Sequence, residues 1–556
     1  MKKRDYLQQR LHDYNPQNCL LRLPFRSSGY HSRVASGEAV HHIRESLSFA
    51  VQLLTIRTAS YTNIACDIIS RILELQDTQP TSATYGIWSY LLEEPLSDMA
   101  PPDWNWADFC GSLLSVALTD YTDTLPFDLQ DRMKASLLHA ARSIFRRNVQ
   151  PSYTNIAIMG AGVAAAAGTL CGEQFLLDYG RERLSNMVTH VQEIGDFAEY
   201  NSPTYTMVAL EETERILHTV HDDSCRESAE WLRRHAWAVI ASHYHPELHV
   251  WAGPHSRTYA DIISRETTHA IWKRVNESDS PVSEPQQDTS IVPIISCPDE
   301  YRNRFYELPR VPHIEDQIIS DSRQEQEQTL YTYFDRKSCV GSVSEDTMWV
   351  QRHGLIGYWP DNAGGIACFR TRMLKDGTDF ASAIQFHAQD HDYVLTAASF
   401  AEGYGDYHVH LDKPANGEFP MSSLVFRFEI RGASATVTHD PNGVFKLSCG
   451  ARQAFVYVAD SMFDGSLVPV RTGGENGYAF IDLVCYEGDT ALLDIRALRD
   501  TLLCAGVRVA DRSSNTGIVP GPQVARDSDL ANVTWVPKTD LRLKLTVPRE
   551  LKRREK

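Results

Sequence analysis

The residues best suited to chemistry gather in the stretch GDFAEYNSPTYTMVAL, residues 195–210. Its polar members stand where the chain enters a helix at Pro203, and they are Asp196, Glu199, Asn201 and Tyr205. The carboxylates could satisfy free backbone N–H groups, and Asn201 ahead of a proline is an ordinary helix start. Capping does not explain Tyr205, one turn inside. The stretch therefore either caps a helix around a core tyrosine or lines a cleft.

A second stretch, PSYTNIAIMGAGVAAAAGTLCG, begins at residue 151. Tyr153 and Asn155 precede a run of small residues at 160–168, which would let neighbouring helices approach closely. Asn155 could be a helix cap or could face a cleft. We keep both interpretations, with Tyr153 as a substrate contact in the second.

A third stretch, HVWAGPHSRTYADI, covers residues 249–262. His255, Arg257 and Tyr259 lie within five positions, after a Gly-Pro turn. An arginine here could bind a carboxylate through two parallel hydrogen bonds. The alternative is a surface loop without a function.

Aromatic residues are frequent in TYGIWSYLLEEP and PPDWNWADF. Indole rings in polar, Pro-rich segments suit the apolar faces of sugar rings, although they could equally fill a gap between helices. The predicted sugar contacts are Tyr85, Trp88, Trp104 and Trp106.

Histidine and aspartate alternate in QFHAQDHDYVL and YGDYHVHLDKP. His387, His391, His408 and His410 could bind a divalent metal together with neighbouring aspartates. The spacing is a weak signal, and we expect the protein to need no cofactor.

Two hydrophobic periods divide the chain. Residues 36–275 show the three-to-four-residue period of amphipathic helices, and after residue 328 the period drops to two. We predict an α+β multidomain protein in three parts: a helical domain at 1–275, a polar linker and surface excursion at 276–328, and an antiparallel β domain at 329–556. The DPNG sequence at 440–443 predicts a hairpin turn.

Composition narrows the class of partner. The 556 residues carry a formal net charge of -18, which argues against nucleic acid and anionic membranes, although a local cationic cluster could still bind an anionic ligand. Eleven scattered cysteines without a CxxC pair, and no signal-peptide pattern, predict reduced thiols in a cytoplasmic protein. An oligomer is compatible with these features.

Together these motifs resemble the heparinase II/III-like and alginate-lyase-like polysaccharide lyases. In that family an Asn, commonly followed by His, opens one helix, and a segment of the form DG…E…SP.Y carries a Tyr about one helical hairpin later. Here TNI provides Asn155 and GDFAEYNSPTY provides Tyr205, fifty positions on. The resemblance implies an α/α toroid, an incomplete barrel of helical hairpins, followed by a C-terminal antiparallel β-sandwich.

The resemblance also implies a β-elimination on a uronic-acid-containing oligosaccharide or polysaccharide, giving a 4,5-unsaturated product. Asn155 and Arg257 would neutralise the sugar carboxylate. Tyr205 would act as base, acid or both, and nearby cations such as His255 and Arg257 would lower its pKa. Ile156 stands where the family has its His, so His255, His408 or His410 would have to replace it. The expected substrate contacts in this account also include Glu199, Asn201, Tyr259 and His408.

Two other functions stay open. A glycoside hydrolase on a related helical toroid would use two carboxyl groups, for which Asp103, Asp108, Asp196 and Glu199 are available. A non-catalytic carbohydrate-binding relative is favoured by Ile156. Because no leader is visible, we expect an enzyme of oligosaccharides rather than intact polymers.

Overall fold

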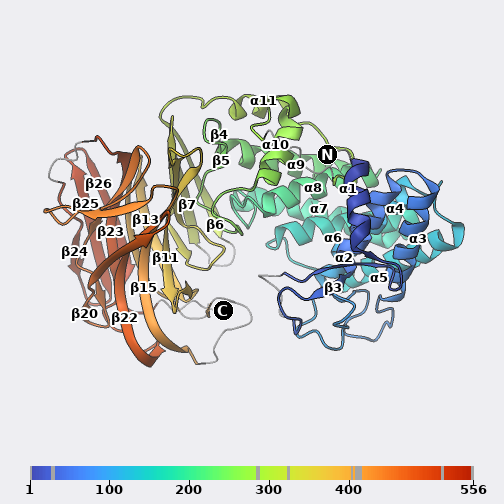
Figure 1. Cartoon of the computed structure of the whole chain (residues 1–556), viewed down its shortest axis with the longest axis horizontal. Coiled ribbons are helices and arrows are strands. Elements are labelled where there is room, and N and C mark those ends of the chain that lie inside the picture. The colour runs from blue at the N-terminus through green and yellow to red at the C-terminus, as the bar shows by residue number, and fades with distance from the viewer. Residues whose placement is uncertain are drawn as a thin grey trace. The chain divides into compact units, whose positions relative to one another are not determined.

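The computed structural model describes residues 3–26, 32–282, 289–321, 326–401, 405–406, 416–514 and 519–551 (Figure 1). These residues form two compact units. The helical unit comprises Met1–Glu193, Tyr205–Ala238 and Arg265–Pro298, and the β unit comprises Ile194–Thr204, Val239–Ser264 and Asp299–Lys556. Two internal segments of the predicted helical half, 194–204 and 239–264, thus belong to the β unit.

The helical unit consists of packed helices and one small sheet. Its helices are α1 (Lys3–Arg10), α2 (Ile43–Leu54), α3 (Ala59–Glu74), α4 (Asn105–Asp120), α5 (Phe127–Arg147), α6 (Thr154–Cys171), α7 (Gln174–Ile194), α8 (Tyr205–Thr219), α9 (Asp223–His243) and α10 (Arg265–Val275). The sheet contains β1 (Tyr14–Asn15), β2 (Leu20–Pro24) and β3 (Ala39–His42).

Helices α4, α6 and α8 pack together. Helices α4 and α6 run in the same direction, because Gly111 of α4 faces Val163 of α6 and Gly160 of α6 faces Asp108 of α4. Glycines permit this approach: a Cβ added at Gly160 would lie 2.5 Å from Asp108 of α4, and one at Gly162 would lie 2.6 Å from Ile216 of α8. Helix α6 is apolar enough to cross a membrane, but 83% of it is buried inside this structure. The small residues predicted to allow tight packing therefore form the central helix of the unit.

The direction of α8 follows from its last turn. His218 Nε2 lies 2.8 and 2.9 Å from the two carboxylate oxygens of Asp120, the last residue of α4. The C-terminal ends of α4 and α8 are therefore adjacent. Their N-terminal ends, together with that of α6, lie at the opposite end of the bundle.

The β unit is built from antiparallel sheets in layers. The nine-stranded sheet has the order β21 (Val470–Glu475), β22 (Tyr478–Asp494), β15 (Glu418–Arg431), β11 (Ile366–Lys375), β10 (Leu355–Pro360), β8 (Ser338–Val343), β7 (Gln326–Asp335) and β6 (His313–Asp321), with β12 (Thr378–Asp379) paired to β11. The seven-stranded sheet has the order β16 (Thr436–His439), β17 (Phe445–Cys449), β18 (Arg452–Val458), β23 (Leu503–Asp511), β14 (Tyr393–Phe400), β13 (Ala383–Asp390) and β9 (Glu345–Thr347).

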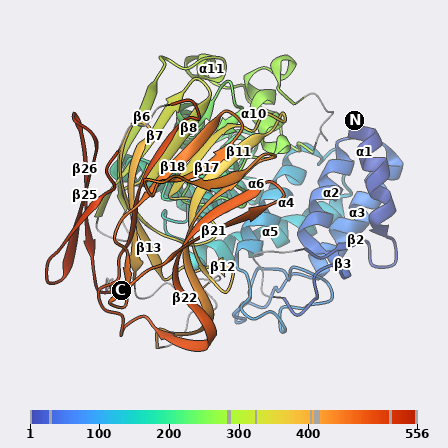
Figure 2. The ribbon, with the colours of Figure 1, turned by 60° about the vertical axis from the view of Figure 1, so that its left-hand side comes forward.

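A third sheet, of β24 (Gln523–Arg526), β25 (Leu530–Lys538) and β26 (Leu541–Pro548), adds a layer beside the larger two (Figure 2). One apolar core joins the nine- and seven-stranded sheets, and a second, which includes Trp535, joins the seven-stranded sheet to β25 and β26. Short pairs complete the unit: β4 (Tyr244–His245) with β5 (Val250–Trp251), and β19 (Met462–Phe463) with β20 (Ser466–Leu467).

The prediction of a helical part followed by an antiparallel β part is confirmed. The predicted hairpin turn is also confirmed, since residues 440–443 connect β16 to β17 and Gly443 has a φ of 83°. The interval 276–328 contains α11 (Asp299–Arg302) and β6.

Candidate active site

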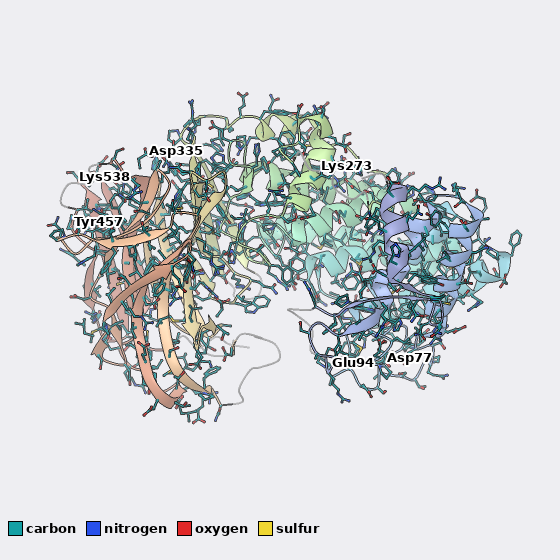
Figure 3. All side chains as sticks on the ribbon, in the orientation of Figure 1. Asp77, Glu94, Lys273, Asp335, Tyr457 and Lys538 are labelled. Atoms are coloured by element: carbon teal, nitrogen blue, oxygen red, sulfur yellow. The ribbon has the colours of Figure 1, made fainter. Side chains whose placement is uncertain are left out.

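A segment of the β unit, residues 239–264, packs on the outer face of the nine-stranded sheet. Leu248, Val250 and Ala252 join a buried cluster with side chains of β7, β8, β10 and β11. His245 donates from Nε2 to the carbonyl of Asp335 at 2.9 Å. Asp335 is the last residue of β7 and is labelled in Figure 3. These contacts fix the position of the loop that carries His255, Arg257 and Tyr259.

Asn201 connects the stretch at residues 195–210 to the segment at residues 239–264. Its amide donates to the carbonyls of Ala252 and Pro254 at 2.9 and 2.7 Å, and its side-chain oxygen accepts from Trp251 Nε1 at 2.6 Å. The residue has no exposed surface and a φ of 40°. The predicted substrate contact thus becomes a structural one, because the amide uses three hydrogen bonds inside the chain.

His255 is buried next to Asn201. It is 1% exposed, and its Nδ1 donates to the carbonyl of Asn201 at 3.0 Å. Burial lowers the pKa of His255 to about 4, so the ring is neutral at pH 7. It cannot be the cation that we expected beside Tyr205.

Arg257 is the cation of this loop. Its Nε donates to Gln351 Oε1 at 3.1 Å, and its Nη1 lies 3.9 Å from Glu199 Oε1. The guanidinium carbon lies 5.2 Å from the ring centre of Trp349, which is a cation–π distance. Its side chain is 22% exposed, whereas Glu199 is buried. Arg257 is therefore held at the surface of the unit with part of its charge open to solvent.

The structure adds His353, which sequence patterns did not single out. Its backbone pairs with that of His255 through N–H···O bonds of 3.0 and 2.9 Å, and the two rings lie 6.2 Å apart. Its Nε2 lies 3.0 Å from Arg370 Nη1, and it is 4% exposed. Most of the histidines singled out in the sequence stand in groups with metal-type spacing, whereas His353 stands alone. The one feature of the sequence that could have pointed to His353 is its place in the polar break VQRHG between two apolar segments.

In the helical unit, Asn155 and Tyr205 occupy corresponding places. Asn155 is the second residue of α6 and Tyr205 the first of α8, at the shared N-terminal end of these packed helices. Asn155 is 5% exposed, and its buried Oδ1 accepts no hydrogen bond from the described residues. Thr206 is also buried, and its hydroxyl makes no hydrogen bond with the described residues. A buried acceptor and a buried hydroxyl without partners among the described residues are typical of a site for a polar ligand.

Acidic and basic groups surround this end of α4. Arg147 donates to Asn105 Oδ1 at 2.6 Å, and Asn105 donates to the hydroxyl of Tyr153 at 3.1 Å. Arg147 also lies 3.9 Å from Asp108. Burial raises the pKa of Asp108 to about 8 despite this arginine, so its carboxyl is mostly protonated at pH 7. Tyr153 thus joins a polar network of its own unit.

The predicted sugar-stacking aromatics lie mainly in the core, which corrects that interpretation. Trp88 has no exposed surface and donates to the carbonyl of Ile72, and Trp106 is 5% exposed with Tyr90 against its ring. Tyr85 is buried and bonds to His139. Two predicted contacts keep accessible ring surface: Trp104, which is half-buried, and Tyr259, which is 57% exposed.

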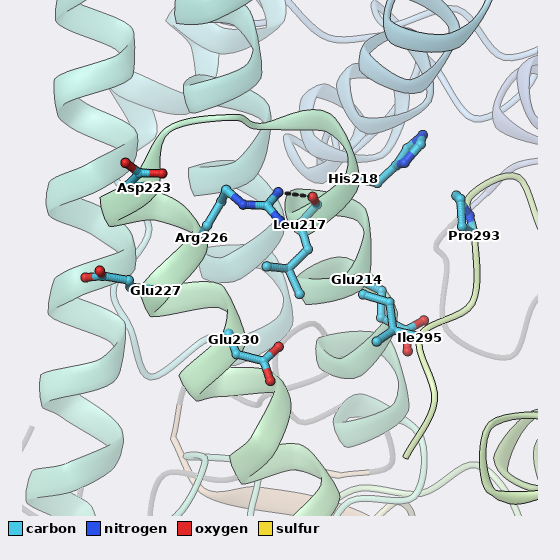
Figure 4. A pocket seen from close by; sticks show the side chains of 9 residues that line it. All are labelled: Glu214, Leu217, His218, Asp223, Arg226, Glu227, Glu230, Pro293 and Ile295. Atoms are coloured by element: carbon cyan, nitrogen blue, oxygen red, sulfur yellow. Dashed lines mark hydrogen bonds between the residues drawn. The ribbon is translucent and has the colours of Figure 1, made fainter. Parts of the chain in front are cut away.

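A cavity of about 770 Å³ in the helical unit does not suit an anionic ligand (Figure 4). Arg226 is the arginine of the lining, and its guanidinium donates a hydrogen bond to the carbonyl of Leu217. The lining is otherwise rich in carboxylates, which would repel a negatively charged sugar. The residues that line it are Glu214, Leu217, His218, Asp223, Arg226, Glu227, Glu230, Pro293 and Ile295.

A metal centre has no support among the described residues, where no group of three His, Cys, Asp or Glu could hold an ion. His387 is buried and its Nδ1 donates to the carbonyl of Val343 at 2.7 Å. His391 contacts Asp390. His408 and His410 lie outside the described residues, so their predicted roles stay predictions.

Residues 25–297 match the model of a family described as a domain of unknown function, DUF8769. No curated protein matches the sequence. Among solved structures, heparinase III is 10% identical, with 94% of this chain and 86% of that chain covered and a TM-score of 0.44. The chondroitin AC lyase of Streptomyces coelicolor, solved with chondroitin sulphate, is 11% identical, with 91% and 89% covered and a TM-score of 0.44.

The xanthan lyase of Paenibacillus is 10% identical, with 96% of this chain and 60% of that chain covered and a TM-score of 0.42. All three are polysaccharide lyases, the class that the motifs of this sequence resemble. At these identities and TM-scores the likeness extends no further than the succession of a helical part and an antiparallel β part.

Proposed function

We propose that this protein is a lyase that cleaves a uronic-acid-containing oligosaccharide or polysaccharide by β-elimination. The observation that carries the proposal is the pairing of Asn155 and Tyr205 at the N-terminal ends of α6 and α8. An amide can neutralise a uronate carboxylate and a phenol can move the protons of the elimination, and the amide oxygen is buried without a partner among the described residues.

The first requirement of the reaction is a neutralised carboxylate. The proton on C5 of a uronate is too weakly acidic to remove while the attached carboxylate keeps its full negative charge. In the proposed mechanism the amide N–H of Asn155 donates to that carboxylate, and the positive ends of α6 and α8 favour the charge that develops on it. Thr206 offers a further hydroxyl that has no partner among the described residues.

The second requirement is a group that moves protons. Tyr205 takes the C5 proton and returns a proton to the leaving 4-oxygen, so the C5–H and C4–O bonds break and a C4–C5 double bond forms. A phenol with a pKa of about 10 is mostly protonated at pH 7 and needs a cation nearby. His255 is neutral, which leaves Arg257 as the cation for this role. Within the β unit, Arg257 Nη1 lies 3.9 Å from Glu199 Oε1.

The experiment is a screen for unsaturated products. The protein is incubated with a panel of uronate-containing oligosaccharides, and the ultraviolet absorbance of the new C=C bond is followed with time. Activity that disappears in Tyr205→Phe and Asn155→Ala, while both variants keep their circular dichroism spectrum, supports the proposal. Full turnover by Tyr205→Phe would refute the mechanism.

A second function, glycoside hydrolysis, is favoured by one observation. Asp108 is a carboxylic acid that stays protonated near neutral pH, as a general acid must be. The same screen separates the two reactions, because hydrolysis gives new reducing ends without ultraviolet absorbance. In that outcome Asp108→Asn would be inactive, whereas a lyase would tolerate it.

A further inference from the structure

His353 has an unusual neighbour for a histidine in a candidate active site. Arg370, on β11, points a guanidinium N–H at its ring: Nη1 lies 3.0 Å from Nε2 of His353. Arginine has five N–H donors and no acceptor, so in this contact Nε2 of the imidazole has to accept. A neutral imidazole that accepts at Nε2 carries its proton on Nδ1.

We infer that Arg370 is a positioning residue that fixes the proton of His353 on Nδ1, so that His353 acts as a hydrogen-bond donor and not as a base. The inference rests on the proposed function only for its catalytic meaning, which is that His353 offers a hydrogen-bond donor and does not take a proton. The tautomer itself can be tested without any substrate.

Arg370 is held rigidly enough for this task. Its Nη1 also lies 2.8 Å from Asp261 Oδ1, and its Nε donates to Glu429 Oε1 at 2.8 Å. Glu429 is fixed in turn by the hydroxyl of Tyr478, which donates to Oε2 at 2.7 Å. Both Arg370 and Glu429 are buried. The guanidinium therefore cannot rotate away from His353 without breaking charged hydrogen bonds to two carboxylates.

The surroundings of His353 favour the neutral ring. Burial, followed by the charge of Arg370, places its pKa well below the usual range, and His255 and Arg372 act in the same direction. Asp261 lies 3.8 Å from Nε2 but is already paired with Arg370. Nδ1 is buried and makes no regular hydrogen bond, although the carbonyl of Val350 faces the ring and acts in the opposite direction on the pKa. A proton on Nδ1 is thus buried beside the carbonyl of Val350.

The direct test is nuclear magnetic resonance of protein labelled with ¹⁵N-histidine, with the His353 signals assigned by their loss in His353→Gln. In the wild type we expect Nδ1 protonated and Nε2 unprotonated at pH 7. In Arg370→Met we expect a mixture of tautomers, and in Arg370→Lys a smaller change, because a cation remains. Protonation of Nε2 in the wild type, or an unchanged spectrum in Arg370→Met, would overturn the inference.

Arg427→Met is the matched control. Arg427, on β15, is also largely buried and bonds to the two oxygens of Asp482 at 2.6 and 2.8 Å, and its described contacts do not include His353. It reports the cost of removing a paired arginine from this sheet. We expect it to leave the tautomer of His353 unchanged, and a change equal to that of Arg370→Met would contradict the inference.

If lyase activity is found, two substitutions of His353 give a second measurement. The Asn side chain places its N–H near the position of Nδ1–H, whereas Gln places it near Nε2. We expect His353→Gln to lower kcat by about 10²-fold, as for the loss of one preorganised donor, and His353→Asn to lower it clearly less. Equal losses would contradict a donor at Nδ1, while absence of lyase activity would refute the proposed function and leave the tautomer result standing.

Discussion

The indole N–H of Trp251 donates a hydrogen bond of 2.6 Å to the side-chain oxygen of Asn201, fifty residues earlier in the chain. This bond holds the segment that carries Glu199 against the loop that carries Arg257. Asn201 therefore fixes the positions of Glu199 and Arg257 relative to each other within the β unit.

Asn201→Ala should destabilise the β unit strongly. The substitution removes three hydrogen bonds and leaves the buried donor and acceptors without partners, at about 1–3 kcal/mol for each unsatisfied group. Urea unfolding would measure the loss. Asn476→Ala is the control, because Asn476 has a similar φ of 50° but is exposed. If both variants lose the same stability, the backbone conformation and not the hydrogen bonds accounts for the effect.

Tyr205→Phe should lower kcat by about 10²–10⁴-fold, which is the range for loss of a general acid–base group. KM should change little, since the ring remains. Tyr306→Phe, at an exposed tyrosine of the β unit, serves as control and should keep full activity. A rise in KM without a fall in kcat would assign Tyr205 to substrate binding instead.

Arg257→Met should raise KM for an anionic oligosaccharide by about tenfold, corresponding to about 1.4 kcal/mol. It should also weaken the salt dependence of kcat/KM, because a partly exposed charge attracts the substrate through a screened field. Arg336→Met is the control for net charge: Arg336 is 69% exposed and lies 3.8 Å from Glu247. Equal effects of both variants would show that only net charge matters.

Asp108 should make stability fall as pH rises. Its folded pKa, about 8, lies above the unfolded value of 3.8, so the folded state binds the extra proton between these pH values. Wild-type stability should therefore decline over about pH 4 to 8, by at most about 1.4 kcal/mol per pH unit from this group.

The Asp108→Asn variant tests this pH dependence, since an amide does not titrate. Unfolding free energies of the two proteins, measured from pH 4 to 9, should diverge in favour of the variant as pH rises. Asp123→Asn should show no such gain, because Asp123 is exposed and its pKa is lowered by Arg57. Parallel curves for wild type and Asp108→Asn would mean that Asp108 is ionised in the folded protein.

The order of the two architectures and the character of individual elements follow from the amino-acid sequence alone. A change of hydrophobic period from about 3.6 to two is a local property, so the helical part, the β part and the hairpin at 440–443 could be read directly. The small residues of α6 likewise predicted close helix packing, which Gly160 and Gly162 provide.

Which polar side chains are available to a ligand, and which are used in hydrogen bonds within the protein, depends on tertiary contacts. Asn201 and His255 look like site residues in isolation, but their hydrogen bonds are used inside the β unit. His353 gained its significance through pairing with His255, ninety-eight residues earlier, and through Arg370 on another strand. Local patterns cannot anticipate these contacts, because burial and the partner of each polar atom depend on strands and loops that meet only after the chain has folded.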